Sequence, residues 1–314
     1  MKSSPGVFGA VCLSLAAVGL LSAGCAAGGA SQASVEPDLG TVSTVTSSSA
    51  VRLPLSRGGV SRDDMRALGA AAMRLTAQCA TRFGVKYTGP LETEVPMDWG
   101  DGRRFGIVSL DDARRYGYMA PDQAQAAGKP RANDKYGPNA WNPNAAELAV
   151  VSGQHTDGSP IPASQLPKDS SGAPLPAGGC SEWADRDLAG GKPLELGFTD
   201  SWAGDANKQA ESDSRVKAAW SDWSACMTQA GFKYDTPWKA SDGFGERTTP
   251  SQREITTAVA DVTCRQRTNL VGRWMAVEAA YQERQIAAHE GEYHEYRQMI
   301  DTALSRAKAV LAGR

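Results

Sequence analysis

The sequence has little histidine, few aromatic residues and no strong excess of charge of either sign. Its 314 residues include 3 histidines, aromatic residues make up 7%, and the formal net charge is −2. A surface that binds nucleic acid is normally basic, so we expect no nucleic-acid partner. The balanced charge also gives no reason to expect a basic patch that binds acidic lipids. The partner therefore has to be sought from other features of the chain.

The sequence also lacks the short motifs of familiar enzymes. It contains no Gly-x-Ser-x-Gly nucleophile turn and no Gly-x4-Gly-Lys phosphate loop. Ser-x-x-Lys occurs at Ser214 and Ser305, but the Lys-Thr-Gly element that accompanies it in penicillin-recognising enzymes is absent. We therefore expect no cofactor and favour a function other than catalysis. Paired carboxylates of glycoside hydrolases have no sequence signature, so a hydrolase stays an open alternative.

The histidines form no metal-binding pattern. His289 and His294 are five positions apart, whereas a zinc protease places two histidines four apart on one helical face. His155 lies in a stretch rich in glycine and proline. The acidic stretch at residues 98–102 lacks the alternating ligands of a calcium loop. We expect no metal site.

The one long apolar run lies near the N-terminus, at residues 7–21. It is shorter than the ~18 apolar residues that a transmembrane helix needs, and Lys2 precedes it, as in a secretory signal peptide. The run ends in Leu-Ser-Ala-Gly-Cys at Cys25, which resembles the bacterial lipobox. The resemblance implies a diacylglycerol on the Cys25 thiol and removal of residues 1–24. Ser22 departs from the usual aliphatic residue, and the alternative is an ordinary signal peptide cut a few residues later.

The number of cysteines supports lipidation of Cys25. The chain has 6 cysteines, of which Cys12 would leave with the signal peptide. In an oxidising compartment four of the others can form two disulfides, and lipidation removes the odd thiol. Two acyl chains suffice for stable anchoring, so we expect the protein at the outer face of the cytoplasmic membrane. The expected disulfide cysteines are Cys79, Cys180, Cys226 and Cys264.

The composition predicts a tether followed by a helical body. Residues 25–50 are rich in Ala, Gly, Ser and Thr, which predicts a lipidated flexible tether. The apolar residues at 51–55 are the first that could dock on a core, as an extended arm. We expect a mainly α fold, with a first helical and loop unit at residues 51–190 and a second at residues 191–314. The two units, with a long C-terminal helical segment, would form one compact body stapled by two disulfides.

Apolar residues recur at helical spacing in several parts of the chain. The clearest stripe begins after Ser61, has Asp63 and Asp64 in its first turn and ends at Gly84. Its apolar residues are Met65, Leu68, Ala72, Leu75, Cys79 and Phe83. Residues 190–212 are expected to be a glycine-rich connection. Further helices are expected at residues 110–116, after Asn144, at residues 180–188, at residues 216–230, and from Thr249 to Leu311.

The last helical segment has a predicted start and predicted interruptions. Thr249 and Gln252 match a capping box, with Pro250 at the first helical position. Asn269, Gly272 and Gly291 are expected to interrupt the segment.

A twelve-residue pattern occurs twice, at residues 79–90 and 226–237. Both copies read Cys-x4-Gly-x-Lys-Tyr-x-x-Pro, and each follows an amphipathic helix. The pattern predicts a helix that carries cysteine on its last turn and stops at glycine. If the copies are related, each should close its own loop, which predicts the pairs Cys79–Cys180 and Cys226–Cys264.

The two Cys-x4-Gly-x-Lys-Tyr helix endings are part of a similarity that extends over more of the chain. Together with Arg115-Tyr116-Gly117-Tyr118, Gly178-Gly179-Cys180 and residues 258–264, they resemble a group of exported actinobacterial lipoproteins. The similarity continues through residues 268–271 and 276–282. The group implies a lipoprotein and adds no activity.

Tryptophan is the remaining candidate for ligand contact. Trp220 and Trp223 lie on a helical stripe and are expected in the core. Trp99, Trp141 and Trp202 lie in polar loops, where they either cover the core or contact a ligand.

We favour a membrane-tethered, non-enzymatic binding or scaffold module of the cell envelope, in contact with an envelope protein complex. The alternative is an envelope hydrolase that uses dispersed carboxylates. A cleft lined by converging carboxylates would favour the hydrolase, and exposed apolar surface would favour binding. A two-lobed solute receptor is disfavoured because alternating strand and helix patterns are absent.

Overall fold

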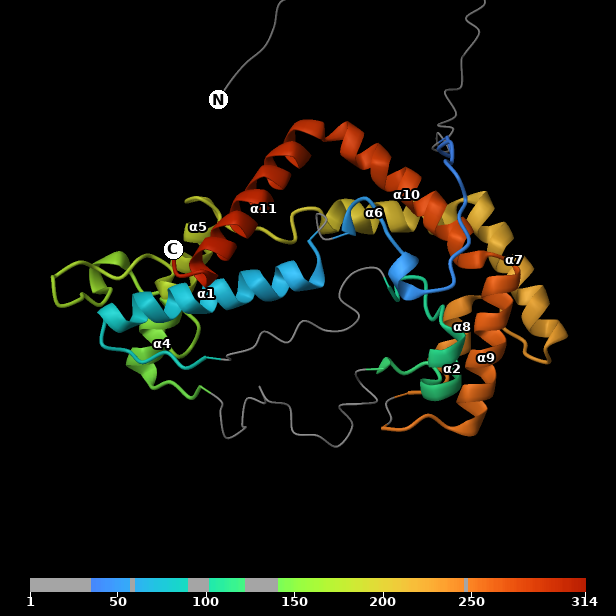
Figure 1. Cartoon of the computed structure of the whole chain (residues 1–314), viewed down its shortest axis with the longest axis horizontal. Coiled ribbons are helices and arrows are strands. Elements are labelled where there is room, and N and C mark those ends of the chain that lie inside the picture. The colour runs from blue at the N-terminus through green and yellow to red at the C-terminus, as the bar shows by residue number, and fades with distance from the viewer. Residues whose placement is uncertain (1–34, 57–59, 90–101, 122–140, 246–247) are drawn as a thin grey trace, which may run out of the picture. The chain divides into compact units, whose positions relative to one another are not determined.

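The computed structural model describes residues 35–56, 60–89, 102–121, 141–245 and 248–314. Over these residues it contains ten α-helices, 60% helix and no strands, which confirms the predicted fold class (Figure 1). Residues Pro37–Arg314 belong to one compact unit, which holds every element described below. Among the described residues, no helix is both long and apolar enough to cross a membrane.

Helix α1, Arg62–Arg82, begins where the sequence predicts. The Ser61 side chain accepts a hydrogen bond from the backbone N–H of Asp64, and the Asp64 carboxylate accepts one from the N–H of Ser61. Its buried face packs against α5, Gly179–Leu188, and α11, Glu290–Leu311. The buried residues are Leu68, Ala71, Leu75, Thr76, Cys79 and Ala80, which include three of the predicted stripe.

Two short helices are confirmed, one of them with its predicted cap at Asn144. Helix α2, Leu110–Tyr116, follows Ser109, whose side chain accepts a hydrogen bond from a backbone N–H of the first turn. Helix α4, Ala145–Ser152, starts with a capping box of Asn144 and Glu147. Helix α4 packs against α5. Helix α5 begins at Gly179, one residue before the start that the sequence predicts.

The larger core lies among the helices of the second half. Helix α10 packs against α6 and α7, and α7 also packs against α9 (Figure 1). Trp223 on α7 and Trp274 on α10 are fully buried there, together with Met227. The helices are α6, Asp200–Ser212; α7, Ser214–Gln229; α8, Pro237–Asp242; α9, Gln252–Arg267; and α10, Leu270–Ala288.

Two sequence expectations for residues 190–252 are wrong, and one short helix there was not expected. Part of the expected connection forms α6, because its buried Ala206 and Ala210 pack against α10 although the helix has little apolar surface of its own. Helix α8 was not predicted. Helix α9 is capped by Ser251 and not by Thr249: the Ser251 side chain accepts a hydrogen bond from the N–H of Glu254 at 3.1 Å. Both cap patterns fit the sequence, and burial of Glu254 favours the later one.

The C-terminal helical segment breaks at Asn269 and His289. Asn269, with φ 49°, separates α9 from α10 as expected, since asparagine tolerates the left-handed region. The expected breaks at Gly272 and Gly291 are wrong, because these residues lie inside α10 and α11. Glycine at position 272 serves a different purpose: a Cβ there would clash with the backbone carbonyl of Ser43.

Residues 37–55, which we call the N-terminal arm, pack against the helical body. Val45, Val51 and Leu53 are buried in the larger core, and the Leu55 N–H donates to Gln282 Oε1 at 2.8 Å. The arm beginning at residue 51 is therefore confirmed. The expectation of a flexible tether is wrong for residues 37–50, which are held by buried Val45 and by the backbone carbonyls of Pro37 and Ser43.

Packing also crosses the expected boundary between residues 190 and 191. Helix α11 packs against α1 and α5, although its sequence belongs to the second half. Helix α2, from the first half, packs against α9. Both sequence halves thus contribute to each of the two main cores.

The repeated pattern gives the same helix ending twice. Gly84 and Gly231 have φ of +74° and +89°, a region that favours glycine. The residue after each glycine donates a backbone hydrogen bond to a carbonyl in the last helical turn, at 3.0 and 2.9 Å. Both copies are therefore left-handed caps of the kind that the pattern predicts.

Candidate functional site

The four cysteines within the described residues are all paired. Cys79 is joined to Cys180 and Cys226 to Cys264, with Cα atoms 5.6 Å apart in both pairs. This confirms the predicted connectivity. Cys25, the predicted lipidation site, lies outside the described residues, and its modification stays a prediction.

A buried ion pair on α9 holds the segment that leads to α2. Asp261, 0% exposed, accepts hydrogen bonds from Arg265 Nε at 2.6 Å and from Trp223 Nε1 at 2.8 Å. Arg265 also donates to the backbone carbonyl of Phe105. The Tyr118 hydroxyl donates to Asp261, and burial together with this carboxylate raises the pKa of the phenol. These groups satisfy one another, so they have a structural role.

Two further buried acids are engaged in the same way. Glu278 forms an ion pair with Arg104, and Asp213 accepts hydrogen bonds from Arg215 and Tyr281. Burial would raise the pKa of Asp213, but the hydrogen bonds from Arg215 outweigh it and lower that pKa. None of these acids lines either of the two hollows described below, and their ion pairs and hydrogen bonds give them a structural role.

The histidines take part in local packing. The His289 ring stacks on Trp202, with centroids 4.7 Å apart, and its Nδ1 lies 3.4 Å from Glu292. His294 lies near Gln298 on the same helix. In the part of the chain that the structure describes, no group of three His, Cys, Asp or Glu side chains could hold a metal ion.

Some tryptophans are buried in the core, and others pack at its edge. Trp223 is fully buried, as predicted, whereas Trp220 is partly exposed at the core edge and packs edge-on against Trp274 at 5.0 Å. Trp141 packs edge-on against Tyr87. Trp202 lies on α6, next to His289, and Trp99 lies outside the described residues.

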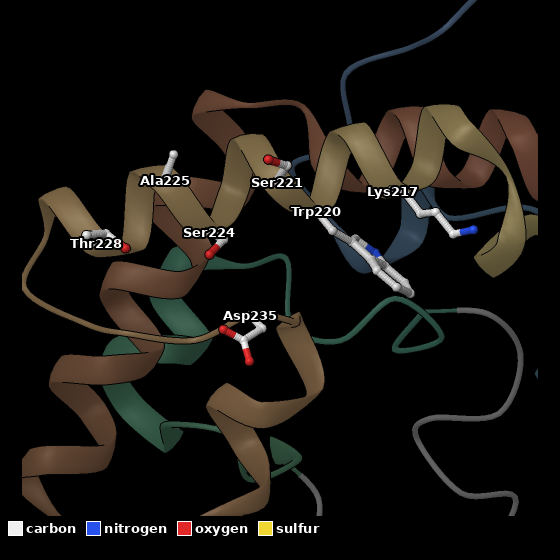
Figure 2. Close-up of a pocket in the computed structure, with 7 residues that line it drawn as sticks. All are labelled: Lys217, Trp220, Ser221, Ser224, Ala225, Thr228 and Asp235. Atoms are coloured by element: carbon white, nitrogen blue, oxygen red, sulfur yellow. The ribbon is translucent and has the colours of Figure 1, made fainter.

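The first hollow is an open groove of about 490 Å³ along α7. Figure 2 shows its side chains on one side of the helix, from Lys217 to Thr228, with Asp235 across from Ser224. The Asp235 carboxylate accepts a hydrogen bond from Lys239, which lowers its pKa, and the Ser224 hydroxyl donates to a backbone carbonyl. Its lining includes neither histidine nor cysteine. The groove therefore has the character of polar surface.

The second hollow, of about 300 Å³, lies between α11 and the connection from α5 to α6. We call it the α11 hollow. The rings of Phe198 and Tyr296 stack in it with centroids 5.4 Å apart. The buried Tyr296 hydroxyl donates to the Leu196 carbonyl at 3.0 Å, and burial raises the pKa of this phenol. The lining residues are Lys192, Pro193, Glu195, Phe198, Glu292, Glu295, Tyr296 and Met299.

Charge and apolar surface are separated in the α11 hollow. Phe198 and Met299 are half-buried and Tyr296 is 4% exposed, so the interior is apolar. Glu195, Glu292 and Glu295 are exposed and form an acidic rim. Lys192 is the one cation among the lining residues, which gives the lining a formal charge of −2. Such a separation suits a ligand that has an apolar part and a positive charge.

Sequence reasoning missed the α11 hollow because its two walls are about a hundred residues apart. The available signal was the group of apolar residues Leu194, Leu196 and Phe198 in the supposed connection, since all three pack against the core formed by α1, α5 and α11. Large apolar residues that recur in a connection indicate a segment docked on a surface.

Comparison of the chain with protein-family models, with curated proteins and with solved structures finds no match. Its function therefore has to be inferred from its own residues.

Proposed function

We propose that the chain is an extracytoplasmic lipoprotein held at the outer face of the cytoplasmic membrane by a diacylglycerol on Cys25. Its helical body would act as a non-enzymatic binding or scaffold module of the cell envelope. The lipobox-like residues that end at Cys25 support the anchor. The resemblance to exported actinobacterial lipoproteins supports the same location.

The observation that carries this proposal is the pairing of the body cysteines. Two disulfides use four of the six cysteines, and such bonds persist in oxidising compartments. Cys12 would leave with the signal peptide, so Cys25 would be the one thiol left. Lipidation removes this thiol and explains why the number of cysteines is compatible with export.

The α11 hollow supports a binding function for the body. Small-molecule sites are concave, mostly apolar and bounded by a few polar groups, and this hollow has that composition. Exposed large apolar residues are scattered among the described residues, at Val35, Val42 and Leu311, and form no surface for a large partner. A small ligand therefore suits the body better than a broad protein interface.

An envelope hydrolase is the second candidate, because Glu195, Glu292 and Glu295 line one hollow. A glycosidase needs one carboxyl group that stays protonated at neutral pH, which burial in an apolar setting normally provides. All three glutamates are exposed, and the Glu292 side chain is 62% exposed. This exposure favours binding. Release of fragments from labelled envelope polysaccharide, abolished by Glu292→Gln, would instead support the hydrolase.

The lipid anchor is tested by replacing Cys25. Wild-type protein is expected to enter the detergent phase on phase separation and to carry the mass of a diacylglycerol. Cys25→Ala is expected to stay in the aqueous phase or to remain unprocessed. Cys12→Ala is the matched control, since it removes a cysteine and should leave lipidation intact. If Cys25→Ala changes neither partitioning nor intact mass, the anchor proposal is wrong.

A further inference from the structure

The α11 hollow combines two features that attract the same kind of charge. The faces of aromatic rings attract cations within about 6 Å, most strongly where water is displaced. Phe198 brings one such ring to the interior, half-buried and stacked on the buried Tyr296, and Met299 adds apolar surface. Carboxylates on the rim attract a cation from farther away and discourage anions. Both the interior and the rim therefore favour a ligand of positive charge.

We propose that the α11 hollow binds a small organic cation of the alkylammonium class. The ammonium group would lie between the glutamates of the rim, and the alkyl groups would pack against Phe198 and Met299. This inference rests on the proposed binding function and names its ligand class. The volume of about 300 Å³ is at the lower end of small-molecule sites, which suits a compact amine.

The interior is held in place before any ligand arrives. The Phe198 ring lies between Tyr296, at 5.4 Å, and Trp202, at 5.2 Å. The Tyr296 hydroxyl holds the Leu196 backbone on α11, so the turn that carries Phe198 cannot easily move away from this helix. A site whose aromatic rings are fixed loses less entropy on binding, which favours recognition of a small ligand.

The rim leaves its carboxylates available to a ligand. Among the described residues, Glu195 and Glu295 form no ion pair, and Glu292 has only His289 nearby, at 3.4 Å. Lys192 lines the hollow and forms no ion pair with these glutamates in the described part of the chain. Its ammonium group would oppose entry of a second cation. The proposal therefore predicts opposite effects for removing the glutamates and for removing this lysine.

The experiment is a calorimetric titration of the purified full chain with choline. Its neutral isostere, 3,3-dimethylbutan-1-ol, has the same shape without the charge and serves as the matched ligand control. Choline is expected to bind at least about tenfold more tightly than the alcohol, and added salt should weaken choline binding. Equal affinity for the two compounds, or no heat from choline at its highest soluble concentration, would overturn the proposal.

Variants locate the binding site. The triple variant Glu195→Gln, Glu292→Gln, Glu295→Gln is expected to weaken choline binding about tenfold or more, and Phe198→Leu about fivefold. Glu283→Gln, an exposed change on α10 outside the hollow, should have no effect. Lys192→Gln should strengthen binding.

Unchanged affinity in the triple variant, or weaker binding in Lys192→Gln, contradicts the assignment. A response to a lysine-rich peptide without any response to choline also contradicts it, because the occupant would then be a protein. Detergent partitioning of the same preparation reports the lipid anchor separately. The proposal on the ligand class and the proposal on the lipid anchor can therefore be refuted independently of each other.

Discussion

The two disulfide-closed regions share a helix ending but differ in what lies behind it. Cys79 and Cys226 each lie on the last turn of a helix that stops at a left-handed glycine. Behind Cys226 is an aromatic core with Trp223 and Trp274 fully buried. Behind Cys79 is a small cluster formed largely by alanine, valine and leucine. The same local signal therefore ends two helices, and the core that packs against the second helix is larger than the core that packs against the first.

The difference extends to the chain between the paired cysteines. The first disulfide spans 101 positions and the second 38. Residues 153–178 in the first are largely irregular, with isolated bridges at Gln154–Pro160 and Lys168–Pro174. The second contains part of α7, with α8 and much of α9. The first region should therefore depend more on its disulfide, and three predictions test this.

Removing the disulfides should give the largest effect. Closure of 101 positions contributes about 4.7 kcal/mol in the chain-entropy model, and closure of 38 about 4 kcal/mol. We expect Cys79→Ala with Cys180→Ala to destabilise the protein more than Cys226→Ala with Cys264→Ala. Urea unfolding measures the two losses.

Hydrogen exchange sharpens the contrast between the two double variants. Amides of residues 153–178 should exchange much faster when the first disulfide is absent, because only short turns and the small cluster around Leu175 then order them. Amides of α7 and α9 should stay protected when the second is absent, because the aromatic core remains. Equal loss of protection in both regions would refute the contrast.

Breaking the buried ion pair should give the next largest effect. Asp261→Asn leaves Arg265, whose side chain is 2% exposed, without its charge partner, and such losses cost about 3–5 kcal/mol. The corresponding change in the first region, Arg82→Ala, removes a side chain that is 52% exposed and should cost at most about 1 kcal/mol. The free energies of unfolding of both variants decide the comparison. Adding Arg265→Met to Asp261→Asn should recover part of the loss.

The smallest predicted effect concerns acid stability of the first region. Hydrogen bonds from Ser171, and then from Arg82, lower the pKa of the Asp169 carboxyl. A lowered folded-state pKa stabilises the protein above the unfolded value of about 3.9 and is lost as the pH falls through the folded value. The melting temperature should therefore fall below about pH 4, and fall less steeply in Ser171→Ala.

The control for this prediction is Ser159→Ala. Asp157 accepts the same kind of hydrogen bonds from Ser159, but within the described residues no arginine side chain bonds to it as Arg82 does to Asp169. We expect a smaller change in the pH profile than in Ser171→Ala. Identical profiles for the wild type and Ser171→Ala would argue against the role given to Asp169.

Local signals in the sequence predict helix starts and ends well. Ser61 and Asn144 cap helices because their side chains reach N–H groups only three residues away. Gly84 and Gly231 end helices because their backbone conformation suits glycine. The disulfide pairing follows from the repeat, since each copy supplies its own partner. These features depend on residues close in sequence or related by duplication.

Features that need distant partners were not predictable in the same way. Ala206 and Ala210 are too small to indicate a helix until α10 covers them. Residues 37–50 have few large apolar side chains and bind partly through the Pro37 and Ser43 carbonyls, and every residue has such a carbonyl. The α11 hollow joins Glu195 to Glu292 only through tertiary packing. Composition and periodicity carry no information on such juxtapositions.

The N-terminal arm also determines how the body would respond to mechanical load. A pull on the residues before Pro37 would act on the hydrogen bond between the Pro37 carbonyl and Arg215, at 2.8 Å. The load would then reach Ser43, held by Asn269, and Leu55, held by Gln282, before it reached α1. These attachments lie at successive positions along the chain, so the arm would yield in steps. Stepwise release of the arm would thereby absorb force transmitted through the N-terminal segment before the helices unfold.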